Sequence, residues 1–429
     1  MSLERVKNRW LIAASAVGVH ISIGSAYAWS VFTNPMVDQF GWSTTEISLV
    51  FSIAIFILGF AAAFMGRFVE KHGPRKSAML AALFFGVGVA GSGLATAMES
   101  LLLLYFFYGI IGGIGLGIGY IAPVSTLVKW FPDHRGLATG LAIMGFGFAA
   151  LISGPAAASL IVKVGISNTF FILGIIYFAV MSLASLYLAP PPKGWAPKGF
   201  RESEQNGTRK IKPDLSQLTA NEAIKTHRFW MLWFMLFLNV TCGIAIISVA
   251  SPMAQQIAGM TPAAAAAMVG IMGLFNGGGR IGWATLSDYI GRPNVYTTFF
   301  VIQIAAFFLL PFAASAILLQ ILVFFIVSCY GGGFSSVPAY IGDIFGTKQL
   351  GAIHGYILTA WAMAGVAGPL LLSLIYDSTK SYNITMFVFG ILFIVALILS
   401  LWIRVDMKRL QGEQYDANIE ISGIVNEPR

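Results

Sequence analysis

Charged residues are scarce in this chain of 429 residues: they make up 10% of it, whereas hydrophobic residues make up 57%. Soluble domains contain about 25% charged residues, so an ordinary water-soluble domain is excluded. The net charge of +8 could indicate a nucleic-acid partner, but the basic residues occur in short segments between apolar runs. The pattern therefore excludes nucleic acid and favours a lipid bilayer around the chain.

Cysteine is nearly absent as well. Cys242 and Cys329 both fall in apolar runs, where they provide neither a disulfide framework nor metal-ligand spacing. No nucleophile–base pair and no metal cluster is evident, so we expect a protein that is not an enzyme and needs no cofactor. The first apolar run is too long for the core of a signal peptide, and no cleavage motif ends it, so we expect no cleaved leader.

Long apolar runs are abundant instead. A bilayer core is about 30 Å thick, and a helix needs about 20 mostly apolar residues to cross it. We therefore predict an all-α integral membrane protein with twelve transmembrane helices. The twelve runs lie at residues 10–33, 45–66, 77–98, 101–125, 136–160, 167–190, 229–256, 262–285, 293–313, 315–340, 351–376 and 384–404.

A polar stretch divides these runs into two sets of six. It extends from Pro190 to Arg228 and is rich in proline, lysine and arginine. The predicted units are an N-terminal six-helix bundle over residues 1–190, a cytoplasmic linker over 191–228, a C-terminal six-helix bundle over 229–404 and a cytoplasmic tail over 405–429.

Lysine and arginine are distributed unequally between the two sides of the predicted helices. Of 26 such residues, only Lys163 and Lys380 fall in the loops of one side, and Arg280 lies inside a run. The other 23 lie in the segments of the opposite side. Because positive residues accumulate on the cytoplasmic side, we expect both termini in the cytoplasm and the protein in the cell (inner) membrane.

The two halves repeat each other in sequence. Four short motifs recur in the same helix order at offsets of 214 to 218 residues. Parallel repeats around an axis along the membrane normal are typical of the two halves of major facilitator transporters, which bind substrate between the halves. The matched motifs are Asn34-Pro35-Met36 with Ser251-Pro252-Met253, Gly66–Gly73 with Ala284–Gly291, Gly117–Tyr120 with Gly331–Phe334, and Gly154-Pro155 with Gly368-Pro369.

Two loops carry charges on the predicted cytoplasmic side. The loop after the second run, with Glu70 and Arg75, resembles the signature loop of the major facilitator superfamily. The loop after the eighth run carries Asp288 and Arg292 in the matching repeat. We interpret these four residues as a cytoplasmic gate, a charge network that holds one conformation and breaks in another. The alternative is that these charges only set the topology.

One charged residue, Arg280, lies deep inside a predicted span. Even the lower scales put the cost of arginine at the centre of a membrane helix at about 2.5–3.5 kcal/mol. A guanidinium suits a carboxylate, which it can hold with two hydrogen bonds. Alternatively, Arg280 could extend to the membrane surface. It precedes the loop residue Asp288 by about 12 Å of helix, which favours a cavity.

Asn276 precedes Arg280 by one turn, so it could bind a substrate, orient the guanidinium or join two helices. No carboxylate lies in the middle of any predicted span, because Glu46 and Asp377 lie near span ends. Arg280 therefore has no evident permanent counter-ion. Since an unpaired buried cation is unfavourable, we expect the substrate to supply the negative charge.

The stretch Leu274–Trp283, with Ser287–Arg292, is similar to the eighth helix of the oxalate/formate antiporter family, which is related to the monocarboxylate transporters. The stretches Lys129–Gly140, Asp343–Thr347 and Tyr27–Trp29 extend the similarity over nearly the whole chain. The resemblance implies a transporter of small carboxylates.

Two positions depart from these families. Oxalate antiporters are expected to carry a second cation, a lysine in the eleventh helix, and alignment through Gly355 puts Trp361 there. One cation suits one carboxylate, so a monocarboxylate is favoured over oxalate. Asn276 replaces the titratable aspartate of the monocarboxylate transporters, which argues against a proton role at this position.

Several aromatic and histidine side chains are candidates for the same cavity. Tyrosine hydroxyls could bind substrate oxygens and ring faces could shape the site, with packing or interface anchoring as the alternative for each. Histidine titrates near physiological pH, so it could carry a proton, with a structural hydrogen bond as the alternative. Beside Arg280 and Asn276, the substrate-binding candidates are Tyr27, Tyr120, Tyr330, Phe334 and Trp361, and the proton-coupling candidates are His20 and His354.

Together these features predict a secondary active transporter of small monocarboxylates such as lactate, pyruvate, formate or acetate. We expect a functional monomer that works by alternating access with proton symport, and anion exchange of the oxalate/formate kind is the alternative. A membrane sensor with this fold is disfavoured, since the sequence shows no large soluble signalling domain.

Overall fold

The computed structural model describes residues 6–192, 194–197, 200 and 214–425. Every regular element in these ranges is a helix. The elements are α1 (Arg9–Gly24), a 3₁₀ helix (Ser25–Phe32), α2 (Thr33–Phe40), α3 (Thr44–Ala97), α4 (Leu101–Leu104), a π-helix (Tyr105–Gly112), α5 (Gly113–Trp130), α6 (Arg135–Tyr187), α8 (Ala220–Ala223), α9 (His227–Ala258), α10 (Pro262–Ile290), α11 (Arg292–Leu309), a 3₁₀ helix (Leu310–Phe312), α12 (Ala316–Phe345), α13 (Leu350–Thr379) and α14 (Tyr382–Val425).

Nine helical stretches among the described residues are long and apolar enough to cross a bilayer. Two helices, α3 with 54 residues and α6 with 53, are too long for a single crossing. Each is broken at one glycine, Gly73 at φ 80° and Gly165 at φ 81°, a backbone conformation that glycine adopts readily. If α3 and α6 each count as two spans and the 29-residue α10 is added, the number of spans is consistent with the twelve that were predicted.

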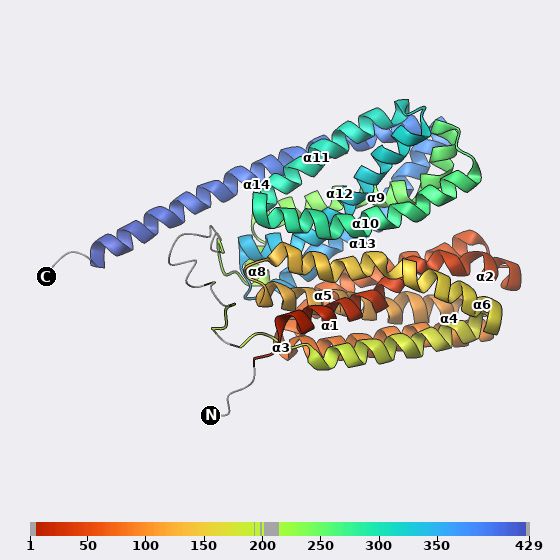
Figure 1. Cartoon of the computed structure of the whole chain (residues 1–429), viewed down its shortest axis with the longest axis horizontal. Coiled ribbons are helices and arrows are strands. Elements are labelled where there is room, and N and C mark those ends of the chain that lie inside the picture. The colour runs from red at the N-terminus through yellow and green to blue at the C-terminus, as the bar shows by residue number, and fades with distance from the viewer. Residues whose placement is uncertain (1–5, 193, 198–199, 201–213, 426–429) are drawn as a thin grey trace.

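The C-terminal helix is longer than its predicted span. That span ends at residue 404, whereas α14 continues to Val425 and extends past the other helices in Figure 1. No proline follows Arg404 before Val425, and the intervening Met, Lys, Arg, Leu, Gln and Glu residues favour helix. Much of the predicted linker and residues 426–429 of the predicted tail lie outside the described residues.

Figure 1 shows the helices in two groups, α1–α6 and α9–α14. The groups meet where α3 packs against α13 and where α6 packs against α10. The residue bounds of the two predicted bundles remain a prediction from the sequence.

Glycine allows the backbones of the two groups to touch. A methyl group on Gly355 of α13 would lie 2.1 Å from the Ala62 carbonyl oxygen of α3. A methyl group on Gly136 of α6 would lie 1.9 Å from the Ala284 carbonyl oxygen of α10. Any side chain at these positions would force the helices apart, so small residues fix the contact between the groups.

The outward faces of the helices carry large apolar side chains. Val162 is 88% exposed, Phe64 78% and Leu102 77%. Soluble proteins rarely expose so many large apolar side chains together. A bilayer would cover them, in agreement with the membrane-spanning helices.

Single cysteines should report the orientation predicted from the positive charges. Glu99→Cys and Lys380→Cys lie at exposed turns and should react with a membrane-impermeant maleimide added outside intact cells. His72→Cys is also exposed but should react only after the cytoplasmic side is opened. Native Cys242 and Cys329 are buried and give a low background. The opposite labelling pattern would reverse the topology.

Candidate functional site

Arg280 lies inside the molecule, with 1% of its surface exposed. Its Nε donates a hydrogen bond to Asn276 Oδ1 at 2.9 Å, and its Nη1 donates to the Ile143 carbonyl oxygen of α6 at 3.3 Å. A methyl group on Gly147 of α6 would lie 3.3 Å from the arginine side chain, and one on Gly331 of α12 would lie 3.2 Å from it. Glycine on both neighbouring helices therefore makes room for a buried arginine.

Within the described part of the chain, no carboxylate pairs with the positive charge of Arg280. None of the ion pairs in the described part of the chain includes Arg280. Its Nη2 is also buried and has no hydrogen-bond partner there. Leaving a buried polar group unpaired costs about 1–3 kcal/mol, and more for a charged group. A bound anion would remove this cost.

Two aromatic rings border the guanidinium. The Arg280 Cζ is 5.8 Å from the Phe146 ring centroid of α6 and 5.6 Å from the Phe334 ring centroid of α12. These distances allow cation–π attraction. The Phe146 and Phe334 rings also contact the Trp361 ring of α13, at 5.8 and 4.7 Å, and Phe146 contacts Tyr120 of α5 at 5.7 Å. Helices of both groups thus contribute to one aromatic cluster beside Arg280.

Tyr27 and Tyr330 complete this aromatic cluster. The Tyr27 ring, in the 3₁₀ helix after α1, meets the Phe146 ring edge-on at a centroid distance of 4.8 Å. The Tyr330 ring lies 5.6 Å from the Phe334 ring, one turn away on α12. The structure therefore brings all five predicted aromatic residues together. It adds Phe146, which the sequence did not distinguish from the other phenylalanines.

The two candidate proton carriers both contact the Tyr120 ring. The ring centroid of His20 on α1 lies 5.4 Å from it, and that of His354 on α13 lies 5.8 Å from it. His20 Nδ1 is 3.0 Å from the Ala16 carbonyl oxygen, whereas His20 Nε2 and both ring nitrogens of His354 have no partner among the described residues. No group of three His, Cys, Asp or Glu side chains in the same ranges could hold a metal ion.

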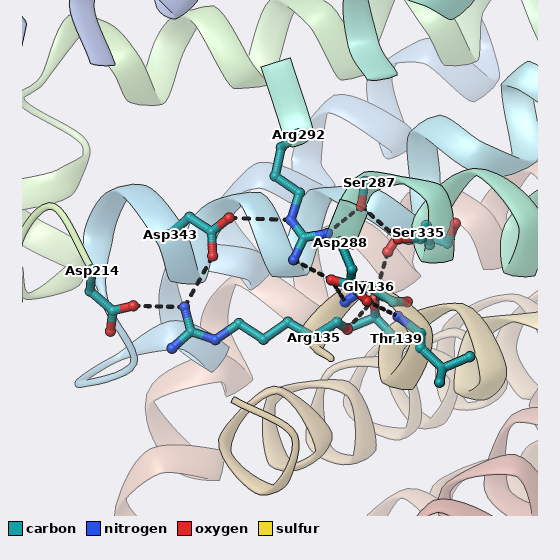
Figure 2. Close-up of polar contacts among 11 residues, drawn as sticks. Arg135, Gly136, Thr139, Asp214, Ser287, Asp288, Arg292, Ser335 and Asp343 are labelled. Atoms are coloured by element: carbon teal, nitrogen blue, oxygen red, sulfur yellow. Dashed lines mark hydrogen bonds and ion pairs between the residues drawn. The ribbon is translucent and has the colours of Figure 1, made fainter. Parts of the chain in front are cut away.

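A second polar cluster lies at the end of the molecule that carries Glu70 and Asp288, which we call the gate end. Asp288 of α10 forms an ion pair with Arg292 of α11 at 2.6 Å. It also accepts hydrogen bonds from the backbone N–H groups of Gly136 and Leu137, at 2.8 and 2.9 Å (Figure 2). Both N–H groups belong to the first turn of α6, where the helix dipole favours a carboxylate.

Glu70, in the N-terminal half, makes the corresponding contact with the start of a helix in the C-terminal half. Its Oε1 accepts a hydrogen bond from the Gly351 N–H in the first turn of α13, at 2.7 Å. Its Oε2 pairs with Lys129 of α5 at 2.8 Å. Glu70 and Asp288 occupy repeated positions in the two halves. Each half therefore supplies one acid that binds the start of a helix in the other half.

Three further residues of the gate end were not predicted from the sequence. Arg135 forms ion pairs with Asp214 at 2.7 Å and with Asp343 at 3.1 Å, and Asp343 also pairs with Arg292 at 3.2 Å (Figure 2). Arg135 and Asp343 lie in stretches that pointed to the family, but their spacing did not show that they meet. The predicted gate residue Arg75 is exposed, and no contact found among the described residues joins it to this network.

The fold is shared with solved membrane transporters. The proton:xylose symporter XylE superposes with a TM-score of 0.69 at 14% identity, over 91% of this chain and 94% of that chain. The Escherichia coli fucose:proton symporter FucP superposes with a TM-score of 0.69 at 16% identity, over 92% and 99%. At such low identities the likeness concerns the fold alone.

Similar sequences include carriers of small carboxylates. The oxalate:formate antiporter of Oxalobacter formigenes is 28% identical, over 84% of this chain and 83% of that protein. Monocarboxylate transporter 14 of Mus musculus is 22% identical over 91% and 88%, and apicoplast pyruvate carrier 1 of Toxoplasma gondii is 24% identical over 68% and 63%. The family model of the Major Facilitator Superfamily matches residues 15–337 and 281–418. The chain therefore belongs to the Major Facilitator Superfamily.

Proposed function

We propose that this transporter carries small monocarboxylates, such as lactate, pyruvate, formate or acetate, across the cell membrane. The observation that carries the proposal is the buried guanidinium of Arg280. Its Nη2 has no partner, and no ion pair among the described residues balances its charge. A carboxylate supplies both the missing charge and acceptor oxygens in the geometry of the guanidinium fork.

The tryptophan at position 361 favours a substrate with a single carboxylate. It occupies the position where the resemblance to oxalate antiporters implies a lysine, and α13 contains no lysine or arginine. A second carboxylate would therefore find no lysine or arginine on α13, and an unpaired buried charge is unfavourable. The names of the similar carboxylate carriers support the same class of cargo.

The contacts at the gate end support alternating access. Glu70 and Asp288 each join one half to the start of a helix in the other half. Helix-end contacts of a carboxylate are worth up to about 2 kcal/mol each, so such a set can hold one side closed and still separate. We place this end and both termini in the cytoplasm, as the positive charges predict.

We propose proton symport as the mode of coupling, with anion exchange as the second candidate. His20 and His354, buried beside Tyr120, could carry the proton. Exchange is favoured by the likeness to the oxalate:formate antiporter and by the charge of Arg280. An empty site with an unbalanced cation is costly to move across the membrane, and a protein that reorients only when loaded is an exchanger.

Arg280→Lys should lower transport about tenfold or more although the charge remains, because lysine cannot form two parallel hydrogen bonds to one carboxylate. Arg280→Ala should lose nearly all transport. Uptake of labelled lactate into proteoliposomes measures both variants. The matched control is Arg75→Lys, since Arg75 is exposed. Full activity of Arg280→Ala would refute the proposal.

An inward proton gradient should drive uptake, so the rate should rise as the external pH falls. Because glutamine cannot take up a proton, His20→Gln should weaken this dependence more than it weakens lactate binding. His72→Gln changes an exposed histidine and is the matched control. Uptake that ignores the gradient but requires an internal carboxylate would establish exchange instead.

A further inference from the structure

The end of the linker, residues 214–223, lies at the gate end, and we call it the strap. It leads directly into the C-terminal half, because only residues 224–226 separate it from α9. Its last four residues form α8, which begins with a capping box: the Thr219 N–H and hydroxyl both donate to Glu222 Oε2 at 2.7 Å. The capping box fixes the start of this short helix.

The strap caps α12. The last carbonyl groups of a helix have no partner within it. At the end of α12 the carbonyl oxygens of residues 343–345 accept hydrogen bonds from the Leu215 N–H, the Ser216 hydroxyl and the Leu218 N–H, at 2.9, 2.6 and 2.9 Å. Leaving a buried carbonyl group without a partner is costly, so these bonds favour a strap that remains on the helix end.

Two further contacts join the strap to the same half. The Ala220 N–H donates to Gln349 Oε1, just before α13, at 2.9 Å. The loop between α12 and α13 contains Gly346, at φ 79°, and a methyl group there would lie 2.3 Å from the Ser216 carbonyl oxygen. Ala220 and Ala223 of the strap are fully buried. The strap is therefore packed closely onto the C-terminal half.

Two side chains of the strap reach the N-terminal half. Asp214 pairs with Arg135 at the start of α6, at 2.7 Å, with side chains 17% and 12% exposed (Figure 2). Gln217 Nε2 donates to the other oxygen of Asp214 at 2.9 Å and helps to orient the carboxylate. Asn221 Oδ1 accepts a hydrogen bond from Arg67 of α3. The strap thus bridges both halves at the gate end.

A cavity of about 770 Å³ borders the Asp214–Arg135 pair. Its walls also include Gln217 of the strap and the gate residues Asp288 and Arg292. A polar cavity of this size admits water, which can solvate both charges when the pair separates. The second bridging contact lies at the surface. Both contacts can therefore break without leaving a buried charge unsolvated.

We propose that the strap is a latch that stays on α12 when the gate end opens and releases Arg135 and Arg67 of the N-terminal half. Backbone hydrogen bonds, close packing and the short connection to α9 hold it to one half, whereas two side-chain contacts hold it to the other. The inference rests on the proposed function, because alternating access is what separates the halves at this end. The linker occurs once in the chain, so the latch adds contacts that the sequence repeat does not provide.

Substitutions in the strap isolate its contribution, because both arginines have other partners in the C-terminal half. Arg135 also pairs with Asp343 at 3.1 Å, and the Arg67 Cζ lies 5.9 Å from the Tyr356 ring centroid. Asp214→Asn removes one carboxylate charge, and Asn221→Ala removes the acceptor for Arg67. Neither substitution touches the groups that donate to the end of α12.

Ser125→Cys places a thiol where opening of the gate end would expose it. Ser125 of α5 is 3% exposed, and a methyl group on Gly351 of α13 would lie 3.4 Å from its Cβ. The maleimide labelling rate of this cysteine in detergent-solubilised protein therefore reports separation of the halves. Asp214→Asn and Asn221→Ala should each raise the rate about threefold, and the double variant about tenfold.

Glu222→Gln is the matched control, because it also removes one carboxylate charge from the strap, whereas its side-chain hydrogen bonds stay within the strap. Asp288→Asn weakens a gate contact outside the strap and is the positive control. If Asp288→Asn raises the labelling rate and the double strap variant does not, the latch is refuted and alternating access stands. If neither raises it, the gate end does not open and both proposals fail.

Cross-linking tests which half the strap follows. Asn221→Cys with Arg67→Cys places two exposed thiols across the bridge to the N-terminal half. The matched pair, Glu222→Cys with Lys348→Cys, is also exposed and lies within the C-terminal half. These two side chains are close together, since the pKa of Glu222 is lowered by the Thr219 hydrogen bonds and also by the charge of Lys348.

A short bis-maleimide, with cross-linking verified by mass spectrometry, should stop lactate counterflow in the first pair and leave it unchanged in the second. Each pair is compared with its own untreated rate, and the native cysteines are buried. Loss of transport in the second pair alone, in both pairs or in neither would overturn the inference. A protein that carries no lactate before treatment contradicts the proposed function instead, and the labelling rates then decide about the latch.

Discussion

A guanidinium buried in a membrane protein is costly, and Arg280 has no carboxylate beside it in the described part of the chain. Its neighbours reduce that cost only in part. Asn276 and the Ile143 carbonyl group each accept one hydrogen bond, and the Phe146 and Phe334 rings border the cation. Nη2 has no partner among the described residues, and under the proposed function the carboxylate of the substrate takes that place. In this proposal, a bound carboxylate neutralises the site and makes it less costly to move through the membrane interior.

The gate end depends on many weak contacts in place of one strong one. Asp288 binds the start of α6, and Glu70 binds the start of α13. The Asp288 side chain is 7% exposed and that of Glu70 is 16% exposed, and a helix-end contact in such a partly buried position is worth up to about 2 kcal/mol. Under the proposed function, a set of contacts of this size holds one side closed, and a ligand that favours the other conformation by a few kcal/mol can open it. Because the two halves repeat each other in sequence, Glu70 of the N-terminal half binds the C-terminal half, and Asp288 of the C-terminal half binds the N-terminal half.

The spans could be predicted from the sequence because a membrane helix must be apolar over about 20 residues, and Arg280 stood out because charge is rare in such runs. Contacts between helices could not be predicted in the same way. Whether Phe146 faces Arg280, or Arg135 meets Asp343, depends on the rotation and register of each helix. A helix that is apolar on all sides has no periodic pattern that would indicate its rotation or its register. The length of α14 was underestimated because hydropathy marks the edge of the membrane and not the end of a helix.

If Arg280 binds the carboxylate of the substrate, removing the charge from the substrate must abolish transport. Counterflow in proteoliposomes preloaded with lactate measures this directly, with external lactate, lactamide and oxalate compared at equal concentration. Lactamide keeps the shape and hydroxyl of lactate but not its charge, and oxalate carries one charge too many for a single cation. We predict rapid exchange of lactate, none of lactamide and little of oxalate. Exchange of lactamide at the rate of lactate would show that Arg280 does not recognise a carboxylate.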